Sequence, residues 1–442
     1  MPRLYNTIKP PGGGSGIMNP MHTEHTLPGG LRVLVEELPH THSVSVGCFV
    51  GVGAGHETHE IAGISHFIEH MLFKGSERYP TPRLISDAIE GVGGVLDAYT
   101  SFESTVYYAK VADIHFDRAV DVLADMLLRP RFDPKDIEKE RRVITEELRQ
   151  TADTPSDLVH TLVDAAVWGD QPLGRDIAGD EESVAGLTRT QILDHWRRFY
   201  TASNMVVSIA GNILTGRALD AISAALAGLP AGEPALCLPS QPPQPGPGVL
   251  LRPDDSEQGN FCLGFPGLPQ SDPDRRAMMV FDTVLGGSMS SRLFQQIREE
   301  LGLAYSVGSY SREHHDAGKW VIYGSVEPAR LRECLAAVMA ELRAARAGGV
   351  TEEELRRVKE QVKGGILLSL EDTWSVAARN GSHTLRYGRV IPVEQVVAEV
   401  EAVRREDVLR VARRVLREEA MHLAVIGPYE DVDDLRALLS LA

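Results

Sequence analysis

Cysteine is scarce in this sequence, and its scarcity excludes two kinds of small stabilised fold. The four cysteines lie far apart and form no C-x-x-C pair: Cys48, Cys237, Cys262 and Cys334. A disulfide framework or a zinc ribbon needs cysteines at short, regular spacings. We therefore expect these residues to be buried thiols in a reducing compartment.

Long apolar runs are also missing, since no stretch of the chain is long enough to span a bilayer. Residues 1–20 are rich in glycine and proline and contain no apolar core of the kind found in signal peptides. We expect a disordered tail over residues 1–22, a cytoplasmic location and no membrane partner.

Basic residues are too few to balance the acidic ones, and the formal net charge is −17. Such an excess argues against non-specific binding to nucleic acid, which needs a basic surface. Solvated surface carboxylates account for most of this charge. The excess also suits a cationic partner, so we expect no nucleic-acid partner and, for a peptide substrate, a preference for basic sequences.

A proline-rich segment divides the chain nearly in half. At 442 residues the chain exceeds the size of a single core, so two or more domains are expected. Residues 228–248 carry frequent prolines and no sustained helix or strand period. We predict an N-terminal unit over residues 23–227 and a C-terminal unit over residues 249–442, joined by this linker.

Segments of the first half recur in the second half, in the same order and at nearly equal offsets. The run from Met205 to Gly211 resembles the run from Met421 to Gly427. A helix expected after Asp133 likewise matches one expected after Thr351. This regularity indicates an internal duplication. Each half interleaves strands with helices, so we predict an α+β fold built from two repeats.

Several helix starts are marked by capping residues. Thr81 and Asp133 each precede a proline at the first helical position, and Thr188 and Thr351 each open a capping box. The helix that starts at Pro82 should end in the glycines at positions 91, 93 and 94. We expect one strand to follow, over residues 95–110, because it is rich in tyrosine, threonine and valine.

The run His66-Phe67-Ile68-Glu69-His70 has the pattern H-x-x-E-H, which is the zincin metal motif in reverse order. If the run is helical, His66 and His70 are four positions apart and lie on one face, where two imidazoles can chelate one zinc ion. Glu69 projects beside that face. A carboxylate at this place can accept a proton from the attacking water instead of binding the metal.

A catalytic zinc site usually takes a third protein ligand. The best source is the acidic helix over residues 136–148, in which Glu140 and Glu147 are two turns apart and share a face. One of the two could bind zinc, and the other could orient an imidazole N–H. The alternative is a solvated helix held by ion pairs between neighbouring turns, which is the usual meaning of an acidic helix.

H-x-x-E-H followed about 75 residues later by glutamate, in a run such as Ile-Glu-Lys-Glu-Arg-Arg-Val-Ile, resembles the pattern of the inverzincin peptidases. This family includes pitrilysin, insulin-degrading enzyme and the mitochondrial processing peptidase, and the resemblance extends from about His25 to Gly427. It implies two homologous repeats, each with a mainly antiparallel sheet packed against helices. It also implies one zinc ion per chain, with His66, His70 and Glu147 as ligands.

The same resemblance assigns the remaining roles at the zinc site. Glu69 would be the general base, and Glu140 would support a ligand from behind. Glu146 competes with Glu147 for the ligand role, but Glu147 keeps the two-turn register with Glu140. Manganese or cobalt could replace zinc, since two histidines and a carboxylate accept these ions as well.

Residues 93–100 resemble the substrate-edge strand of the family, which implies that Asp97, Ala98 and Tyr99 bind an extended peptide. Asp97 stands where the family usually has asparagine. The change removes an N–H donor and adds negative charge, so it could favour cationic substrates or be a neutral variation.

The run from Gly286 to Ser306 resembles a second signature of the family, in which Arg298 and Tyr305 hold substrate carbonyls and assist the oxyanion. The alternative is a surface ion pair for Arg298 and a half-buried strand position for Tyr305. In the family this pair reaches the zinc site from a second half-molecule. Because one chain carries both signatures, we expect a homodimer in which each chain completes the other's site.

The function expected from the resemblance is that of a zinc metalloendopeptidase of the processing-peptidase type, which cleaves extended or unfolded peptides in a chamber formed by two chains. The rival is a non-catalytic homologue, like the core subunits of the respiratory complex, or a peptide-binding subunit of a hetero-oligomer. We expect the other histidines near the two signatures to be surface or loop residues: His22, His25, His40, His42, His56, His59, His314 and His315.

Overall fold

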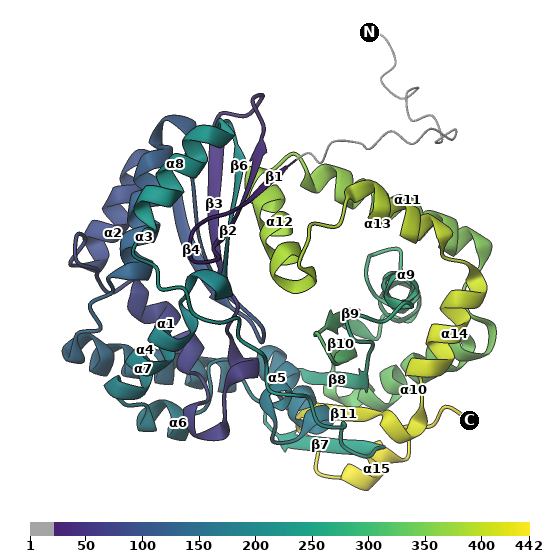
Figure 1. Cartoon of the computed structure of the whole chain (residues 1–442). Helices are drawn as coiled ribbons and strands as arrows, with labels where there is room; N and C mark the ends of the chain where they lie inside the picture. The colour runs from purple at the N-terminus through teal and green to yellow at the C-terminus, as the bar shows by residue number, and fades with distance from the viewer. Residues whose placement is uncertain (1–21) are drawn as a thin grey trace, which may run out of the picture.

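The computed structural model describes residues 22–442 of the chain. The disordered tail predicted for residues 1–22 lies outside this range, apart from its last residue. Figure 1 shows two lobes, with the first half of the chain in purple to teal and the second half in green to yellow.

The first half contains one six-stranded sheet and the helices around it. Its elements, in chain order, are β1 (Thr23–Thr26), β2 (Arg32–Glu37), β3 (Ser43–Val50), α1 (Ile64–Leu72), α2 (Pro82–Ile89), β4 (Val95–Thr100), β5 (Thr105–Ala112), α3 (Phe116–Leu128), α4 (Pro134–Ala152), α5 (Pro155–Trp168), α6 (Glu181–Gly186), α7 (Arg189–Phe199), β6 (Met205–Gly211) and α8 (Thr215–Ala225).

The second half contains a five-stranded sheet with its own helices. Its elements are β7 (Gly248–Pro253), β8 (Gly259–Pro266), α9 (Arg275–Leu285), the π-helix η7 (Phe294–Glu300), β9 (Ala304–Glu313), β10 (Gly318–Val326), α10 (Leu331–Gly348), α11 (Glu352–Ser369), α12 (Thr373–Tyr387), α13 (Val393–Ala402), α14 (Arg405–Val415), β11 (His422–Gly427) and α15 (Val432–Arg436).

The two sheets have the same topology. The first runs β1-β2-β6-β3-β5-β4 and the second runs β7-β11-β8-β10-β9. In each, one parallel pair, β2 with β6 or β7 with β11, is followed by antiparallel pairs only. The first sheet differs by one extra edge strand, β1, which pairs with β2. The predicted duplication and the α+β class are therefore confirmed.

Each half buries its own apolar core. In the first half, valines of the central strands pack against α1, α3 and α7. In the second half, Phe261, Leu263 and Phe265 of β8 pack against helices such as α9, α10 and α14. Burial of this much aliphatic surface is the main favourable term in folding, so each sheet has the means to hold its helices in place.

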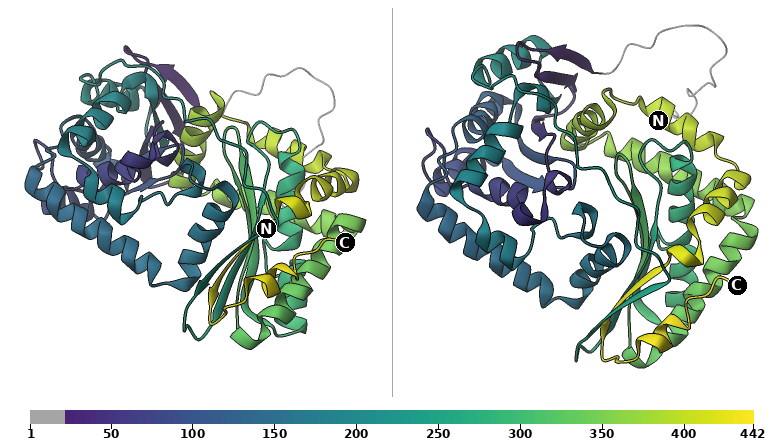
Figure 2. Two further views of the ribbon diagram at one scale, coloured as in Figure 1. Left: turned by 90° about the horizontal axis from the view of Figure 1, so that it is seen from below. Right: turned by 60° about the horizontal axis from the view of Figure 1, so that its bottom comes forward.

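The halves also exchange helices. Helix α5 packs on β8 and β11 of the second sheet, whereas α12 packs on β3 and β6 of the first sheet. Figure 1 shows α12 beside β6, and both views of Figure 2 show α5, in blue, reaching the green strands. A glycine in each central strand permits the contact. A β-carbon at Gly47 would lie 2.8 Å from the ring of Trp374, and one at Gly264 would lie 2.6 Å from Val163.

The predicted helix starts are confirmed, and one strand prediction is wrong. The side chains of Thr81, Asp133, Thr188 and Thr351 each accept a hydrogen bond from a backbone N–H in the first turn of their helix. The strand expected over residues 95–110 is two strands, β4 and β5, joined by a turn. Alternation of residue types does not reveal a tight turn that contains no glycine or proline. Within residues 22–442, no helix is both long enough and apolar enough to cross a membrane.

Candidate metal centre

Helix α1 carries the H-x-x-E-H motif and is fixed on its other face. Phe67, Ile68 and Met71 are buried in the first core. The helix packs on α4, α7 and β4. Before it, the buried carboxylate of Glu57 accepts hydrogen bonds from the backbone N–H groups of Gly63 and Ser65, at 2.7 Å and 2.9 Å. These donors belong to the open N-terminal turn, so Glu57 anchors the start of the helix.

The structure brings the three predicted ligands together. One atom each of His66, His70 and Glu147 can be chosen so that all three lie within 4.8 Å of one another. His70 Nε2 lies 3.1 Å from His66 Nε2 and 3.6 Å from Glu147 Oε2. Donors around one tetrahedral zinc ion, each at about 2.0–2.1 Å, are about 3.3 Å apart, so these spacings fit the ion.

The two histidines differ in protonation. Burial, assisted by the neighbouring His70, lowers the pKa of His66 to about 4, so its imidazole is neutral. Its Nδ1 is buried without a hydrogen-bond partner. Burial lowers the pKa of His70, but its contacts with Glu140, Glu147 and Glu69 outweigh burial and raise that pKa. His70 donates from Nδ1 to Glu140 Oε1 at 2.9 Å, so a cation that displaces the proton of Nε2 would meet a lone pair directed toward His66 and Glu147.

Glu140 and Glu147 take different places on α4. Glu140 is 1% exposed, and Lys74 Nζ lies 2.7 Å from its second carboxylate oxygen. Burial raises the pKa of Glu140, but the contacts with His70 and Lys74 outweigh burial and hold it below the usual value. Glu147 faces the imidazoles, whereas Glu146 is exposed and lies outside the cluster. The geometry therefore places Glu147, and not its neighbour, at the centre.

Glu69 is positioned as a proton acceptor. Thr100 Oγ1, at the end of β4, donates a hydrogen bond to Glu69 Oε2, and the other carboxylate oxygen stays available. Burial raises the pKa of Glu69, and the charges of Asp97 and Glu147 act in the same direction. A carboxylate with a raised pKa is the better general base near neutral pH.

Strand β4 lies at the free edge of the first sheet, next to α1. Asp97 and Tyr99 are exposed on it and Ala98 is half-buried. An edge strand offers unpaired backbone groups to an extended peptide. Asp97 accepts hydrogen bonds from the Ala98 N–H at 2.8 Å and from the Tyr108 hydroxyl at 3.3 Å, so its carboxylate is tied to the strand itself.

Arg298 and Tyr305 lie together, but away from the metal centre of their own chain. The guanidinium of Arg298, on the π-helix η7, stands 5.5 Å from the ring centre of Tyr305 at the start of β9. Tyr305 is 75% exposed. Across residues 22–442, no hydrogen bond or ion pair joins either residue to His66, Glu69, His70 or Glu147.

Three supporting residues were missed by the sequence analysis. Lys74 lies two residues beyond the end of α1, so helical spacing does not place it, and its contact with Glu140 depends on tertiary structure. The contacts of Thr100 with Glu69 and of Glu57 with the helix start depend on tertiary structure, and no sequence pattern indicates them. His56 and His314 lie in connections between the main elements, as expected for loop residues, but they are not freely exposed, and burial lowers the pKa of each to about 4.

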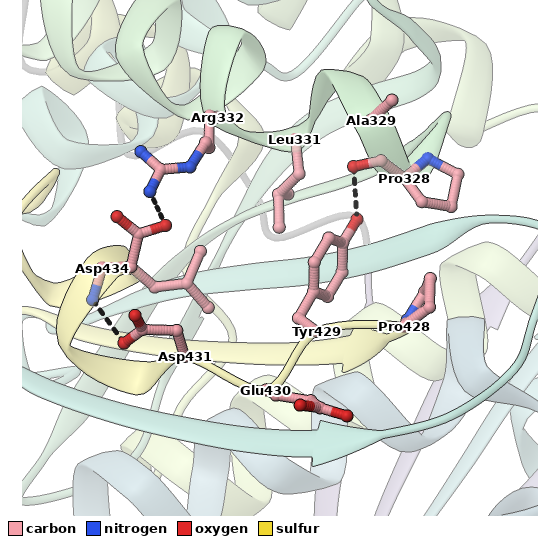
Figure 3. Close-up of a pocket in the computed structure, with 10 residues that line it drawn as sticks. Pro328, Ala329, Leu331, Arg332, Pro428, Tyr429, Glu430, Asp431 and Asp434 are labelled. Atoms are coloured by element: carbon pink, nitrogen blue, oxygen red, sulfur yellow. Dashed lines mark hydrogen bonds and ion pairs between the residues drawn. The ribbon is translucent and has the colours of Figure 1, made fainter.

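A hollow of about 360 Å³ lies in the second half, between residues 328–332 and residues 428–435, and contains none of the metal-centre residues. Figure 3 shows its lining, with the Tyr429 hydroxyl donating to the Pro328 carbonyl and Arg332 paired with Asp434. The Asp434 N–H in turn donates to Asp431. The side chains of Arg332, Tyr429, Asp431 and Asp434 are thus each paired with a neighbouring side chain or backbone group.

Comparison with known proteins agrees with this geometry. Residues 32–181 match the family model "Insulinase (Peptidase family M16)", and residues 186–362 match "Peptidase M16 inactive domain". A protease from Helicobacter pylori has a structure with a TM-score of 0.86, at 20% identity over 92% of this chain and 100% of that one. The chain thus has the two-repeat fold of the M16-like peptidases.

Relatives identified by sequence show to which family the chain belongs. A relative described as "Uncharacterized zinc protease YmxG", from Bacillus subtilis, is 38% identical over 92% of this chain and 98% of its own length. A probable mitochondrial-processing peptidase subunit beta of Arabidopsis thaliana is 32% identical over 92% of this chain and 79% of its own. The chain belongs to peptidase family M16. The resemblance drawn from H-x-x-E-H is therefore confirmed.

Proposed function

We propose that this chain is a zinc-dependent endopeptidase of the processing-peptidase type, which cleaves extended or unfolded peptides. The observation that carries the proposal is the convergence of His66, His70 and Glu147 beside Glu69, a half-buried carboxylate that binds none of them. Relatives named as zinc proteases support the same reading.

In this proposal the chain's own residues divide the work. A zinc ion held by His66, His70 and Glu147 would supply Lewis-acid activation of water and of the scissile carbonyl. Glu69 accepts a proton on its carboxylate and returns it to the leaving amine. Thr100 keeps the Glu69 carboxylate oriented, and Glu140 keeps the Nδ1–H tautomer of His70.

The substrate is expected to add as a strand along β4, whose free edge lies beside α1. Only an unfolded segment can pair in this way. Carboxylates at Asp97 and Glu147 stand near Glu69 and favour a basic peptide. The test is hydrolysis of a quenched, unstructured basic peptide by the reduced full chain. Cleavage should stop on chelation and return with zinc, and cleavage that persists without metal would contradict the proposal.

Two chains are proposed to form the working chamber, since Arg298 and Tyr305 have no contact with the metal centre of their own chain in the described part of the molecule. Chains carrying Glu69→Gln and chains carrying Arg298→Ala should each be weak. Mixed together, they should regain activity because one site of the mixed dimer then has both residues. No recovery, with mixed dimers demonstrated by mass spectrometry, would show that Arg298 does not act across chains.

A non-catalytic or peptide-binding subunit is the second candidate. It is favoured by the match of residues 186–362 to a model described as an inactive domain. That match begins at residue 186, after the H-x-x-E-H motif and α4, so the described inactivity does not concern the segment that carries His66, Glu69, His70 and Glu147. Tight, metal-independent binding of the peptide without any cleavage would favour this candidate.

A further inference from the structure

A second group of metal-type donors lies where the two halves meet. One atom each of Glu103, Cys237 and His315 can be chosen so that all three lie within 4.8 Å of one another, the same limit that the first centre meets. None of these residues belongs to the H-x-x-E-H site. They come from three segments that are far apart in the sequence: the turn between β4 and β5, the proline-rich linker, and the turn between β9 and β10.

Several contacts hold these segments together around the group. Glu103 Oε1 accepts a hydrogen bond from the His315 backbone N–H at 2.7 Å, and the His315 ring Nδ1 lies 3.7 Å from the same oxygen. The linker is tied on both sides of Cys237, since before it the Ala235 N–H donates to Asn204 Oδ1 at 2.8 Å and two further contacts follow it. Leu238 donates from its N–H to the Gly55 carbonyl at 2.9 Å, and Ser240 donates to Asp316 at 2.8 Å. The donors are therefore already gathered before any ion binds, which lowers the cost of ordering them.

His56 supports the thiol from the side. Its Nε2 lies 3.5 Å from Cys237 Sγ, and its Nδ1 lies 3.2 Å from the backbone N–H of Gly53. If Nδ1 accepts that hydrogen bond, Nε2 carries the proton and donates it toward the sulfur. A hydrogen bond of this kind stabilises a metal-bound thiolate in the way that outer partners stabilise metal ligands elsewhere.

The local field favours a cation. Burial, together with the nearby carboxylates of Glu103 and Asp316, which oppose a second negative charge, raises the pKa of Cys237 to about 12. The same two carboxylates attract a positive ion. Binding of a divalent ion would displace the thiol proton to solvent and leave a thiolate, an imidazole and a carboxylate around it.

We propose that Glu103, Cys237 and His315 form a second metal site of the zinc class, which fastens the two halves and the linker to one another. Thiolate with imidazole favours zinc or cobalt over magnesium or calcium, which prefer oxygen ligands. A hollow of about 440 Å³ opens onto all three residues and gives the ion a route from solvent. The fourth position of the ion is left to water.

Cobalt distinguishes the two sites, because only the second has a sulfur ligand. Cobalt(II) added to the reduced, metal-free full chain should give the near-ultraviolet charge-transfer absorption of a cobalt–thiolate bond. Cys237→Ser should abolish this absorption, whereas Cys334→Ser, which changes a buried thiol elsewhere, should keep it. His56→Ala should weaken cobalt binding by about 10-fold. No absorption in the unchanged chain, or absorption that survives Cys237→Ser, would overturn the proposal.

A stability measurement tests the fastening and is independent of peptidase activity. In a chain with His66→Ala and His70→Ala, which lacks the first centre, zinc should still raise the unfolding temperature, because the ion binds the folded state selectively. The rise should disappear on adding His315→Ala, a change at a side chain that is 54% exposed and so tolerated by the fold. An equal rise with and without His315→Ala would show that zinc acts elsewhere.

Discussion

Helices α1 and α9 occupy equivalent places in the two sheets, after β3 and after β8, and yet they bury different chemistry. Helix α1 holds Glu69, whose carboxylate accepts one hydrogen bond, from Thr100. Helix α9 holds Asp282, whose carboxylate accepts hydrogen bonds from both the Trp320 indole, at 2.7 Å, and the Ser309 hydroxyl, at 2.6 Å. Burial raises the pKa of both carboxyl groups.

The difference teaches how one fold can carry a reactive acid in one copy and a structural acid in the other. Asp282 accepts two hydrogen bonds from side chains of the second half, both on Oδ1, and serves the core of that half. Glu69 keeps an open oxygen beside two imidazoles, which is what proton transfer needs. The sheet is common to both halves, so the metal centre is an addition to the fold and not a requirement of it.

The largest effect should separate these two acids. Glu69→Gln is expected to lower kcat/KM for the peptide by roughly 10²–10⁴, because the variant cannot take a proton. Its free energy of unfolding should change little. Asp282→Ala should do the opposite and lower the free energy of unfolding by about 1–3 kcal/mol, because it leaves the buried Trp320 indole N–H without a partner.

The test is to measure urea unfolding and peptide hydrolysis for both variants. Asp282→Asn is the matched control, since an amide oxygen can still accept both hydrogen bonds and should restore most of the lost stability. The comparison would fail if Glu69→Gln unfolded as easily as Asp282→Ala. That result would mean that both carboxylates have structural roles.

The next effect concerns neighbouring carboxylates on α4. Glu147→Gln should weaken zinc binding by about 100-fold or more, since a lost ligand costs at least as much as a lost outer partner. Glu146→Gln should bind zinc as the unchanged chain does, because Glu146 points to solvent. Competition against a chromophoric chelator gives both affinities. Equal losses of zinc affinity in the two variants would mean that Glu146 contributes to zinc binding as much as Glu147 does.

Local rules predicted the two repeats and the helix starts, because caps and duplicated segments are recorded in short stretches of sequence. Helical spacing also predicted that His66 and His70 share a face and that Glu140 or Glu147 joins them, and the family resemblance then selected Glu147 as the ligand. The exchange of α5 and α12 between the halves could not be predicted, because periodicity shows that a helix has an apolar face but not which sheet covers it. The contact of Thr100 with Glu69 was missed for the same reason.

In each half, a glutamate on one of the equivalent helices α4 and α11 forms an ion pair with a basic side chain. We expect mutation of the two pairs to have different effects. In the second half, Arg292 Nε lies 2.6 Å from Glu354 Oε1. Burial raises the pKa of Glu354, but the hydrogen bonds from Arg292 and from Thr351 outweigh it and lower the pKa to about 2. A lowered folded-state pKa stabilises the fold above the unfolded pKa of 4.5, and this stability is lost as the pH falls toward 2.

The pair should therefore contribute at most about 3 kcal/mol at neutral pH, and its loss should be complete only in strong acid. The free energy of unfolding, measured by urea at about pH 6 and about pH 3, should fall more for the unchanged chain than for Glu354→Gln. Equal falls in the two proteins would show that Glu354 is not the acid-sensitive group.

The smallest expected effect on zinc binding comes from the ion pair of the first half, Lys74 with Glu140. Lys74→Met should weaken zinc binding by only about 10-fold, because the change acts on the metal through Glu140 and His70. Without the ammonium group, the buried Glu140 carboxylate holds a proton more readily and then accepts a weaker hydrogen bond from His70 Nδ1. Lys74→Arg should restore the affinity, and Lys135→Met, at an exposed position of the same helix α4, should leave it unchanged. If Lys74→Met lowered the free energy of unfolding but not the affinity for zinc, the pair would serve the fold, as Arg292 and Glu354 do in the second half.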